Sequence, residues 1–148
     1  MPRQIIAIGS DHAGFALKTG LVGELQALGY DVLDLGPVSE ASVDYPDYAY
    51  AVASAVTDGR AASGVLVCGT GIGMSIAANR HPGIRAALCT DGLMARYSRE
   101  HNDANTLVLG SRIIGSEVAF DCLRQFLATP FSGGRHIGRV TKLSNPSI

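Results

Sequence analysis

Short apolar runs alternate along the chain with longer stretches in which apolar residues recur every three or four positions. The runs are aliphatic or β-branched, and most end in Gly or a polar residue, as strands buried on both faces do. They lie at residues 5–9, 31–36, 64–69, 84–89 and 106–110. The stretches with helical spacing lie at residues 13–28, 48–59, 73–80, 92–101 and 116–128. Strand then helix, repeated five times, predicts an α/β fold, a doubly wound three-layer sandwich on a five-stranded parallel sheet.

The strand order expected for five such units is the flavodoxin-like order 2-1-3-4-5. No repeat or linker interrupts the alternation, so residues 1–148 are expected to form a single Rossmann-like domain. The pattern lapses only past about residue 130, in a tail that carries Arg135, His136, Arg139 and Lys142.

Composition narrows the class of partner. Of the 148 residues 47% are hydrophobic, and 12 Lys and Arg nearly balance 13 Asp and Glu. A formal net charge of -1 does not suit a binder of nucleic acid or acidic membrane, so the expected partner is a small molecule. No apolar run is long enough to span a bilayer, and the opening breaks at Gly9 and Ser10 before a secretory segment could form, which favours a cytosolic location. The three cysteines include no C-x-x-C pair and are expected to be free thiols.

Ligands bind such sheets outside the carboxyl ends of the strands, so the loops there are the places to search for chemistry. In the loop "CGTGIG", residues 68–73, Gly69, Gly71 and Gly73 permit positive φ and a close approach of the backbone to a ligand at the start of a helix. This pattern predicts an anion cradle. A tight turn that binds nothing would have the same pattern.

The glycine loop fits the better-known phosphate cradles poorly. A P-loop needs a lysine that this loop lacks. A dinucleotide fingerprint needs glycine in the sixth place, where Met74 stands, although Asp91 does end the next strand as that fingerprint requires. A dinucleotide-binding module therefore stays open as a rival.

Cys68 is the first residue of the glycine loop. A cysteine that closes a buried strand is ordinarily an inert small hydrophobe, and that interpretation fits Cys89 and Cys122. Cys68 differs because the backbone dipoles that follow it favour the thiolate, which makes it a candidate base or nucleophile. His12 is a second candidate, although Asp11 beside it also suits a helix cap.

The remaining polar clusters are weaker signals. His101 to Asp103 join a helix to the last strand, where His and Asn are also common as helix terminators. Arg135, His136 and Arg139 are either a solvated basic face or donors suited to a phosphate.

Several motifs in one order resemble the type B ribose-5-phosphate isomerases, in the family that also holds allose-6-phosphate and galactose-6-phosphate isomerases. The motifs are SDHAGFALK, DYPDYA, CGTGIGMSIAANR, GIRAALC, SREHNDANTLVLGSRIIG and GGRHIGRV, and they run nearly from end to end of the chain. The resemblance implies aldose–ketose isomerisation through a cis-enediolate, with no metal and no cofactor.

The resemblance also implies a role for individual residues. Cys68 would be the base, and Thr70 with the amides of Gly69, Gly71, Ile72 and Gly73 would hold the negative oxygen. Asp11 and Tyr45 would contact sugar hydroxyls, and His101 would open the furanose ring with Asn102 beside it. The phosphate would be held by His12, Arg112, Arg135 and Arg139.

Two features of the glycine loop favour one branch of this family. A second branch lacks the cysteine and uses a glutamate in the place of Met74, and galactose-6-phosphate enzymes depart from the sequence CGTGIG. Ribose 5-phosphate is therefore the expected substrate, with allose 6-phosphate or another six-carbon phosphosugar as the alternative. A dinucleotide-binding module and a cysteine-nucleophile hydrolase remain as hypotheses from other classes.

Topology adds an expectation about assembly. Cys68 follows the third strand, whereas His101 precedes the fifth, so the two lie at opposite edges of the sheet within one chain. If both act on one sugar, they come from different subunits. A homodimer with shared sites, which could pair into a tetramer, is expected, with the tail from about residue 130 packed on the partner subunit.

Overall fold

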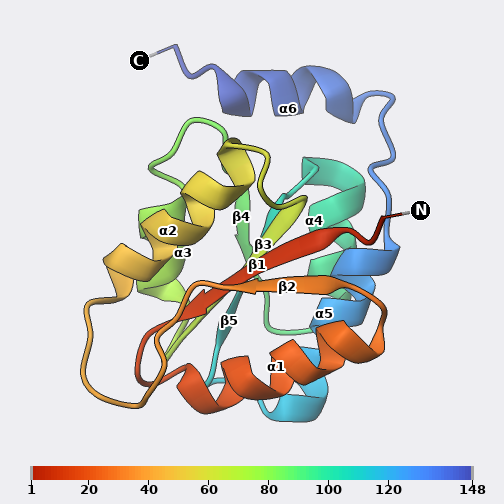
Figure 1. Ribbon diagram of the computed structural model, residues 1–148. Coiled ribbons are helices and arrows are strands. Elements are labelled where there is room, and N and C mark those ends of the chain that lie inside the picture. The colour runs from red at the N-terminus through yellow and green to blue at the C-terminus, as the bar shows by residue number, and fades with distance from the viewer. Residues whose placement is uncertain (1, 148) are drawn as a thin grey trace.

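The computed structural model describes residues 2–147, and strands and helices alternate in it as the sequence predicts. The strands are β1 (Ile5–Ser10), β2 (Asp31–Asp34), β3 (Ser63–Cys68), β4 (Ala86–Leu88) and β5 (Thr106–Gly110). The helices are α1 (Phe15–Ala27), α2 (Tyr45–Thr57), α3 (Ile72–Ala78), α4 (Gly92–Asn102), α5 (Ser116–Ala128) and α6 (His136–Ser144). Figure 1 shows the sheet between α2 and α3 on one side and α1 and α5 on the other, so the predicted α/β sandwich is confirmed.

All strand pairs are parallel, and the strand order is β2-β1-β3-β5-β4. The predicted order 2-1-3-4-5 is therefore wrong for its last two strands. Every residue of β5 is buried, which suits a central strand, whereas β4 has only three residues, all partly exposed, which suits an edge. As a consequence, the carboxyl ends of β1, β3 and β5 lie side by side.

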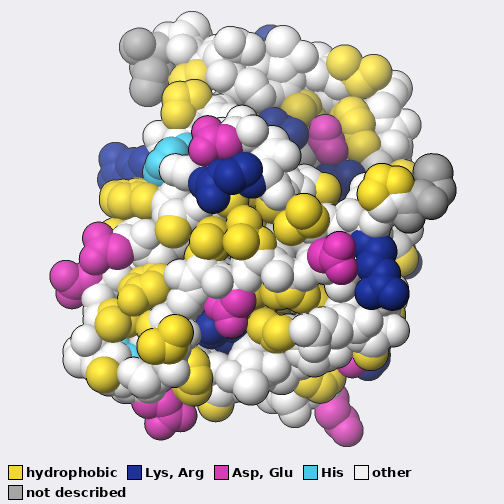
Figure 2. Space-filling model, viewed as in Figure 1, with side chains coloured by type: hydrophobic (Ala, Val, Ile, Leu, Met, Phe, Trp, Pro, Cys, Tyr) yellow, Lys and Arg dark blue, Asp and Glu magenta, His cyan; other side chains and the backbone are white. Residues whose placement is uncertain are grey.

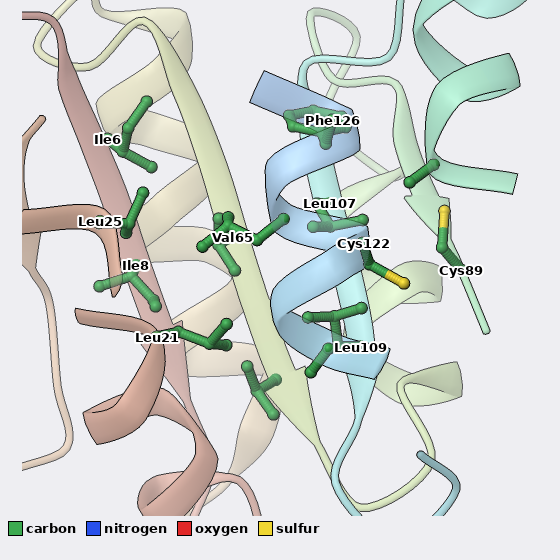
Figure 3. Close-up of a cluster of buried hydrophobic side chains, with 14 of the residues drawn as sticks. Ile6, Ile8, Leu21, Leu25, Val65, Cys89, Leu107, Leu109, Cys122 and Phe126 are labelled. Carbon is green, nitrogen blue, oxygen red and sulfur yellow. The ribbon is translucent and has the colours of Figure 1, made fainter. Parts of the chain in front are cut away.

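One hydrophobic cluster fills the space between the sheet and the layer of α1, α4 and α5 (Figure 3). The strands contribute Ile6, Ile8, Val65, Leu107 and Leu109, and the helices contribute Leu21, Leu25, Cys122 and Phe126. A second cluster on the other face joins the sheet to α2 and α3. Each large apolar side chain buried in this way stabilises the fold by about 1.5–3 kcal/mol, so the two clusters hold the strand ends, and hence the loops, in place.

Cys89 and Cys122 both belong to the first cluster, and neither is in a disulfide. Burial raises the pKa of Cys89 to about 12 and that of Cys122 to about 11. Nearby negative charge adds to both shifts. Both thiols therefore stay protonated near neutral pH, as expected of structural cysteines.

Helix α6 forms in the tail, where the sequence predicted no element. It packs against α4, has no buried residue, and leaves Ile137 and Leu143 more than half exposed. Figure 1 shows α6 lying across one end of the molecule, outside the two helical layers. The packing of this tail on a partner subunit stays a prediction.

Figure 2 shows acidic and basic side chains interspersed over one face of the molecule, without a large patch of one sign. Within residues 2–147 no helix has the length and apolar character needed to cross a membrane.

Candidate active site

Three loops meet at the carboxyl edge of the sheet because β1, β3 and β5 are neighbours there. Asp11 N–H donates to Val67 O at 3.1 Å, which joins the β1–α1 loop to β3. Ser111, after β5, donates its N–H to Cys68 O and its hydroxyl to Ala13 O, both at 2.9 Å. These bonds fix the three loops relative to one another.

Cys68 is the last residue of β3 and is only 5% exposed. The chain turns back immediately after it, because Gly71 has a φ of +80°, which residues with side chains rarely adopt. This turn lets Gly71 N–H donate to Cys68 Sγ at 3.2 Å, while Ile72 N–H donates to Thr70 Oγ1 at 3.2 Å. The loop therefore points a backbone amide at the sulfur, and the anion cradle stays a prediction.

Two side chains from other loops cover the glycine loop. Tyr45 begins α2, whose first turn accommodates Pro46 because proline has no N–H to leave unpaired. A Cβ on Gly73 would lie 2.6 Å from the Tyr45 ring, so only glycine admits the ring at that place. A Cβ on Gly69 would lie 3.2 Å from Arg112 Nη1. The loop lacks side chains of its own where a phenol and a guanidinium approach it.

Asp11 and His12 lie in the β1–α1 loop. Asp11 is 8% exposed, and its Oδ1 accepts a hydrogen bond from Gly14 N–H at 2.9 Å, so it does hold the start of α1. His12 Nδ1 accepts a hydrogen bond from Val43 N–H at 3.2 Å. A neutral His12 then carries its proton on Nε2, which makes Nε2–H the donor that the ring can offer to a ligand.

His101 and Asn102 end α4 at the amino edge of the sheet. Asp103, the next residue, lines a cavity together with Ser63, where β3 begins. From there β5 runs to the carboxyl edge, where its last residue pairs with Cys68. Its four steps of about 3.3 Å span about 13 Å, so His101 and Cys68 of one chain are separated by at least the length of a strand.

The His101 ring lies in a stack of three rings. It packs on Tyr97 at 4.7 Å and on His136 at 4.5 Å, both between ring centroids. The pKa of His136 is lowered because partial burial disfavours the charged ring, and positive charge on His101, Arg135 and Arg139 adds to the effect. The stack therefore places the start of α6, with its two arginines, beside His101.

The residues that the sequence assigns to one site thus form two groups in one chain. The carboxyl edge carries Cys68, Gly69, Thr70, Gly71, Ile72 and Gly73 with Asp11, His12, Tyr45 and Arg112. The amino edge and α6 carry His101, Asn102, Arg135 and Arg139.

Three residues at these sites have contacts that the sequence did not predict. Tyr97 precedes His101 by four positions, and this helical spacing could have revealed the ring pair. His136 reaches His101 only because α6 packs against α4, a contact that sequence spacing does not determine. Ser111 lies in the loop after β5, and its two partners come from distant segments.

Other candidates serve the fold instead. Asp91 Oδ1 accepts a hydrogen bond from Met94 N–H at 2.8 Å, so the acid that suggested a dinucleotide site caps α4. Met74, in the place of the other branch's glutamate, is fully buried. Within residues 2–147 no three His, Cys, Asp or Glu side chains are grouped so as to hold a metal ion.

We expect the three thiols to differ in reactivity. At pH 8, about one Cys122 in a thousand and fewer Cys89 are ionised, because the pKa values of about 11 and 12 lie far above this pH. Iodoacetamide should therefore modify one site, Cys68, as measured by peptide mass spectrometry. Equal labelling of Cys122 in folded protein would contradict this expectation.

Comparisons with known proteins agree with this arrangement. Residues 6–143 match the model of the Ribose/Galactose Isomerase family. Ribose-5-phosphate isomerase B of Escherichia coli is 46% identical over 139 residues, which cover 94% of this chain and 93% of that protein. The D-erythrulose-4-phosphate isomerase of Pectobacterium atrosepticum is 43% identical over 140 residues, which cover 93% of this chain and 91% of that protein. The crystal structure of a ribose 5-phosphate isomerase from Thermotoga maritima superposes with a TM-score of 0.94 at 53% identity, covering 97% of this chain and 99% of that one.

The cysteine and the glycine loop lie at the carboxyl edge of a parallel α/β sheet, which is the edge where such folds bind ligands. The match over nearly the whole chain identifies the class: this protein belongs to the Ribose/Galactose Isomerase family and is a sugar-phosphate isomerase resembling the type B ribose-5-phosphate isomerases.

Proposed function

We propose that this protein interconverts ribose 5-phosphate and ribulose 5-phosphate through a cis-enediolate, with Cys68 as the general base. The observation that carries the proposal is the hydrogen bond from Gly71 N–H to Cys68 Sγ in a loop where every second residue is glycine. A donor aimed at the sulfur favours the negative charge that a thiolate base must carry.

The chemistry is a transfer of one proton between neighbouring carbons. Cys68 removes the proton from C2 of the open-chain aldose, the C–H electrons form a C1–C2 double bond, and the carbonyl electrons move to O1. We expect the Thr70 hydroxyl and the amides of residues 69–73 that do not donate to Cys68 Sγ to hold the negative oxygen of this enediolate. Cys68 returns the proton to C1, and the O2 hydroxyl passes its proton to O1 as its electrons form the C2 carbonyl, which gives the ketose with no net oxidation and no net change in protons.

In this proposal the phosphate is bound by hydrogen-bond donors from both groups of residues. His12 can donate through Nε2–H, and Arg112 lies against Gly69 next to the base. Arg135 and Arg139 lie beside His101 on α6, away from this edge. We place the second group in the site of a partner subunit, so that a two-fold dimer holds two shared sites and α6 packs on the partner.

An assay on three phosphosugars tests the proposed substrate. Purified protein without added metal is given ribose 5-phosphate, allose 6-phosphate or erythrulose 4-phosphate, and formation of the isomer is measured. The four-carbon arm is included because a relative bears the name D-erythrulose-4-phosphate isomerase. The highest kcat/KM is expected with ribose 5-phosphate, and a clear preference for another sugar would reassign the substrate.

The cytosolic location and a tetramer of two dimers stay predictions.

Removing either tail arginine is expected to weaken the reaction strongly. Arg135→Ala and Arg139→Ala each remove a charged donor from a dianionic phosphate, so kcat/KM should fall by about 2–3 kcal/mol apiece, which is roughly 30- to 150-fold. Lys142→Ala, at the exposed end of the same helix, is the matched control and should change kcat/KM little. Unchanged kinetics in both arginine variants would mean that α6 is only a solvated basic face.

A further inference from the structure

Lys18 is a buried cation that the proposed mechanism does not use. It lies in the second turn of α1, and only 2% of its side chain is exposed. Burying an ammonium group is costly unless every donor finds an acceptor. The hydrogen-bond partners of the Lys18 ammonium group therefore indicate the role of this residue.

The Lys18 ammonium donates to three oxygen atoms of one neighbouring segment. Asp34 Oδ1 and Oδ2 accept at 2.7 and 3.0 Å, and Pro37 O accepts at 2.9 Å. Asp34 Oδ1 also accepts from Gly36 N–H at 2.9 Å. An ammonium group has three N–H donors, so this lysine is fully satisfied by the end of β2 and the start of the loop after it.

That loop, residues 35–44, leads into the candidate site. At its start, Gly36 O accepts a hydrogen bond from Ser10 N–H at 3.1 Å. At its end, Val43 N–H donates to His12 Nδ1, and Tyr45 follows with its ring against Gly73. The loop is thus anchored to α1 by Lys18 at one end and to the β1–α1 loop by His12 at the other.

We infer that Lys18 is a positioning residue, which sets the place of loop 35–44 and through it the orientation of His12 and the position of Tyr45. The inference rests on the proposed function, in which His12 binds the phosphate and Tyr45 a sugar hydroxyl. The glycine loop is held by other contacts, from Ser111 and within itself, so the base does not depend on Lys18. Loss of the lysine should accordingly weaken substrate binding more than proton transfer.

The test compares two variants, each of which removes one ion pair made by α1. Lys18→Met keeps the length of the side chain and removes the charge, and KM for ribose 5-phosphate should rise roughly tenfold, the equivalent of one charge-assisted hydrogen bond, while kcat stays within about twofold. Amide hydrogen exchange over residues 35–44 should quicken about fivefold or more in the same variant. Arg124→Met is the control, because it removes the 2.7 Å ion pair between Arg124 and Glu24 of α1, away from this loop, and should leave KM unchanged.

Each outcome decides the inference. A lower melting temperature with unchanged KM and unchanged exchange over residues 35–44 would make Lys18 a purely structural residue, and an equal rise of KM in Arg124→Met would show general loosening instead of positioning. If Lys18→Met does not fold, Asp34→Asn, which weakens the ion pair at a half-exposed position, decides by the same two measurements with a smaller shift. If wild-type protein fails to isomerise ribose 5-phosphate, the proposed substrate is wrong, and the exchange of residues 35–44 tests the role of Lys18 by itself.

Discussion

Replacing Cys68 by alanine is expected to reduce ribose 5-phosphate turnover by a factor of about 10² to 10⁴, the usual cost of a lost general base. The variant loses one sulfur atom at the end of β3, and the backbone pairing of Cys68 with Gly110 does not involve that atom. The fold and the binding of the phosphosugar should therefore survive. Steady-state kinetics and a melting curve on the same preparation measure the two effects separately.

Cys122→Ala provides the matched control for this prediction. Its sulfur lies in the first hydrophobic cluster, where its removal should cost about 1–2 kcal/mol of stability through lost packing without touching the site. The two variants should thus show opposite patterns, with turnover lost at Cys68 and stability lost at Cys122. Near wild-type turnover in Cys68→Ala would show that Cys68 is not the general base, whatever the control shows.

The three-layer fold could be predicted because each buried strand is a short, nearly continuous apolar run and the stretches between the strands carry apolar residues at helical spacing. The order of the last two strands could not. Residues 84–89 and 106–110 look equally apolar in sequence, and only packing shows that the whole of β5 is buried while β4 is a short edge strand. Helix α6 was not predicted because it follows no strand and lies outside the two helical layers, although Ile137, Val140 and Leu143 recur in it at helical spacing.

The part of the candidate site that depends on local sequence could be predicted. The cysteine, the glycines and the carboxyl ends of β1, β3 and β5 follow from residue type and strand direction alone. Contacts between distant segments did not follow, such as Lys18 with Pro37 or His101 with His136, because sequence spacing does not determine which loop lies against which helix. The split of the expected site residues into two groups did follow, since strand direction fixes which edge each loop occupies.

This split predicts what happens when two inactive chains are combined. His101 and Cys68 of one chain lie at opposite edges of the sheet, so a sugar bound at Cys68 can meet only the His101 of another chain. In a two-fold dimer each site would take Cys68 from one subunit and His101 from its partner. Cys68→Ala and His101→Ala homodimers then carry one lesion in every site. A mixed dimer collects both lesions in one site and leaves the other with both native residues.

Co-expression of the two variants with different tags should therefore restore activity that neither parent has. Random pairing makes about half of the dimers mixed, and one of two sites works in each, so turnover of ribose 5-phosphate should recover to roughly a quarter of wild type. Purification on both tags in turn isolates the mixed dimer. Because one of its two sites works, its turnover per dimer should be about half that of wild type. Parents mixed after purification, without chain exchange, provide the control. Verified mixed dimers no more active than the two parents would place His101 in the site of its own chain or outside catalysis.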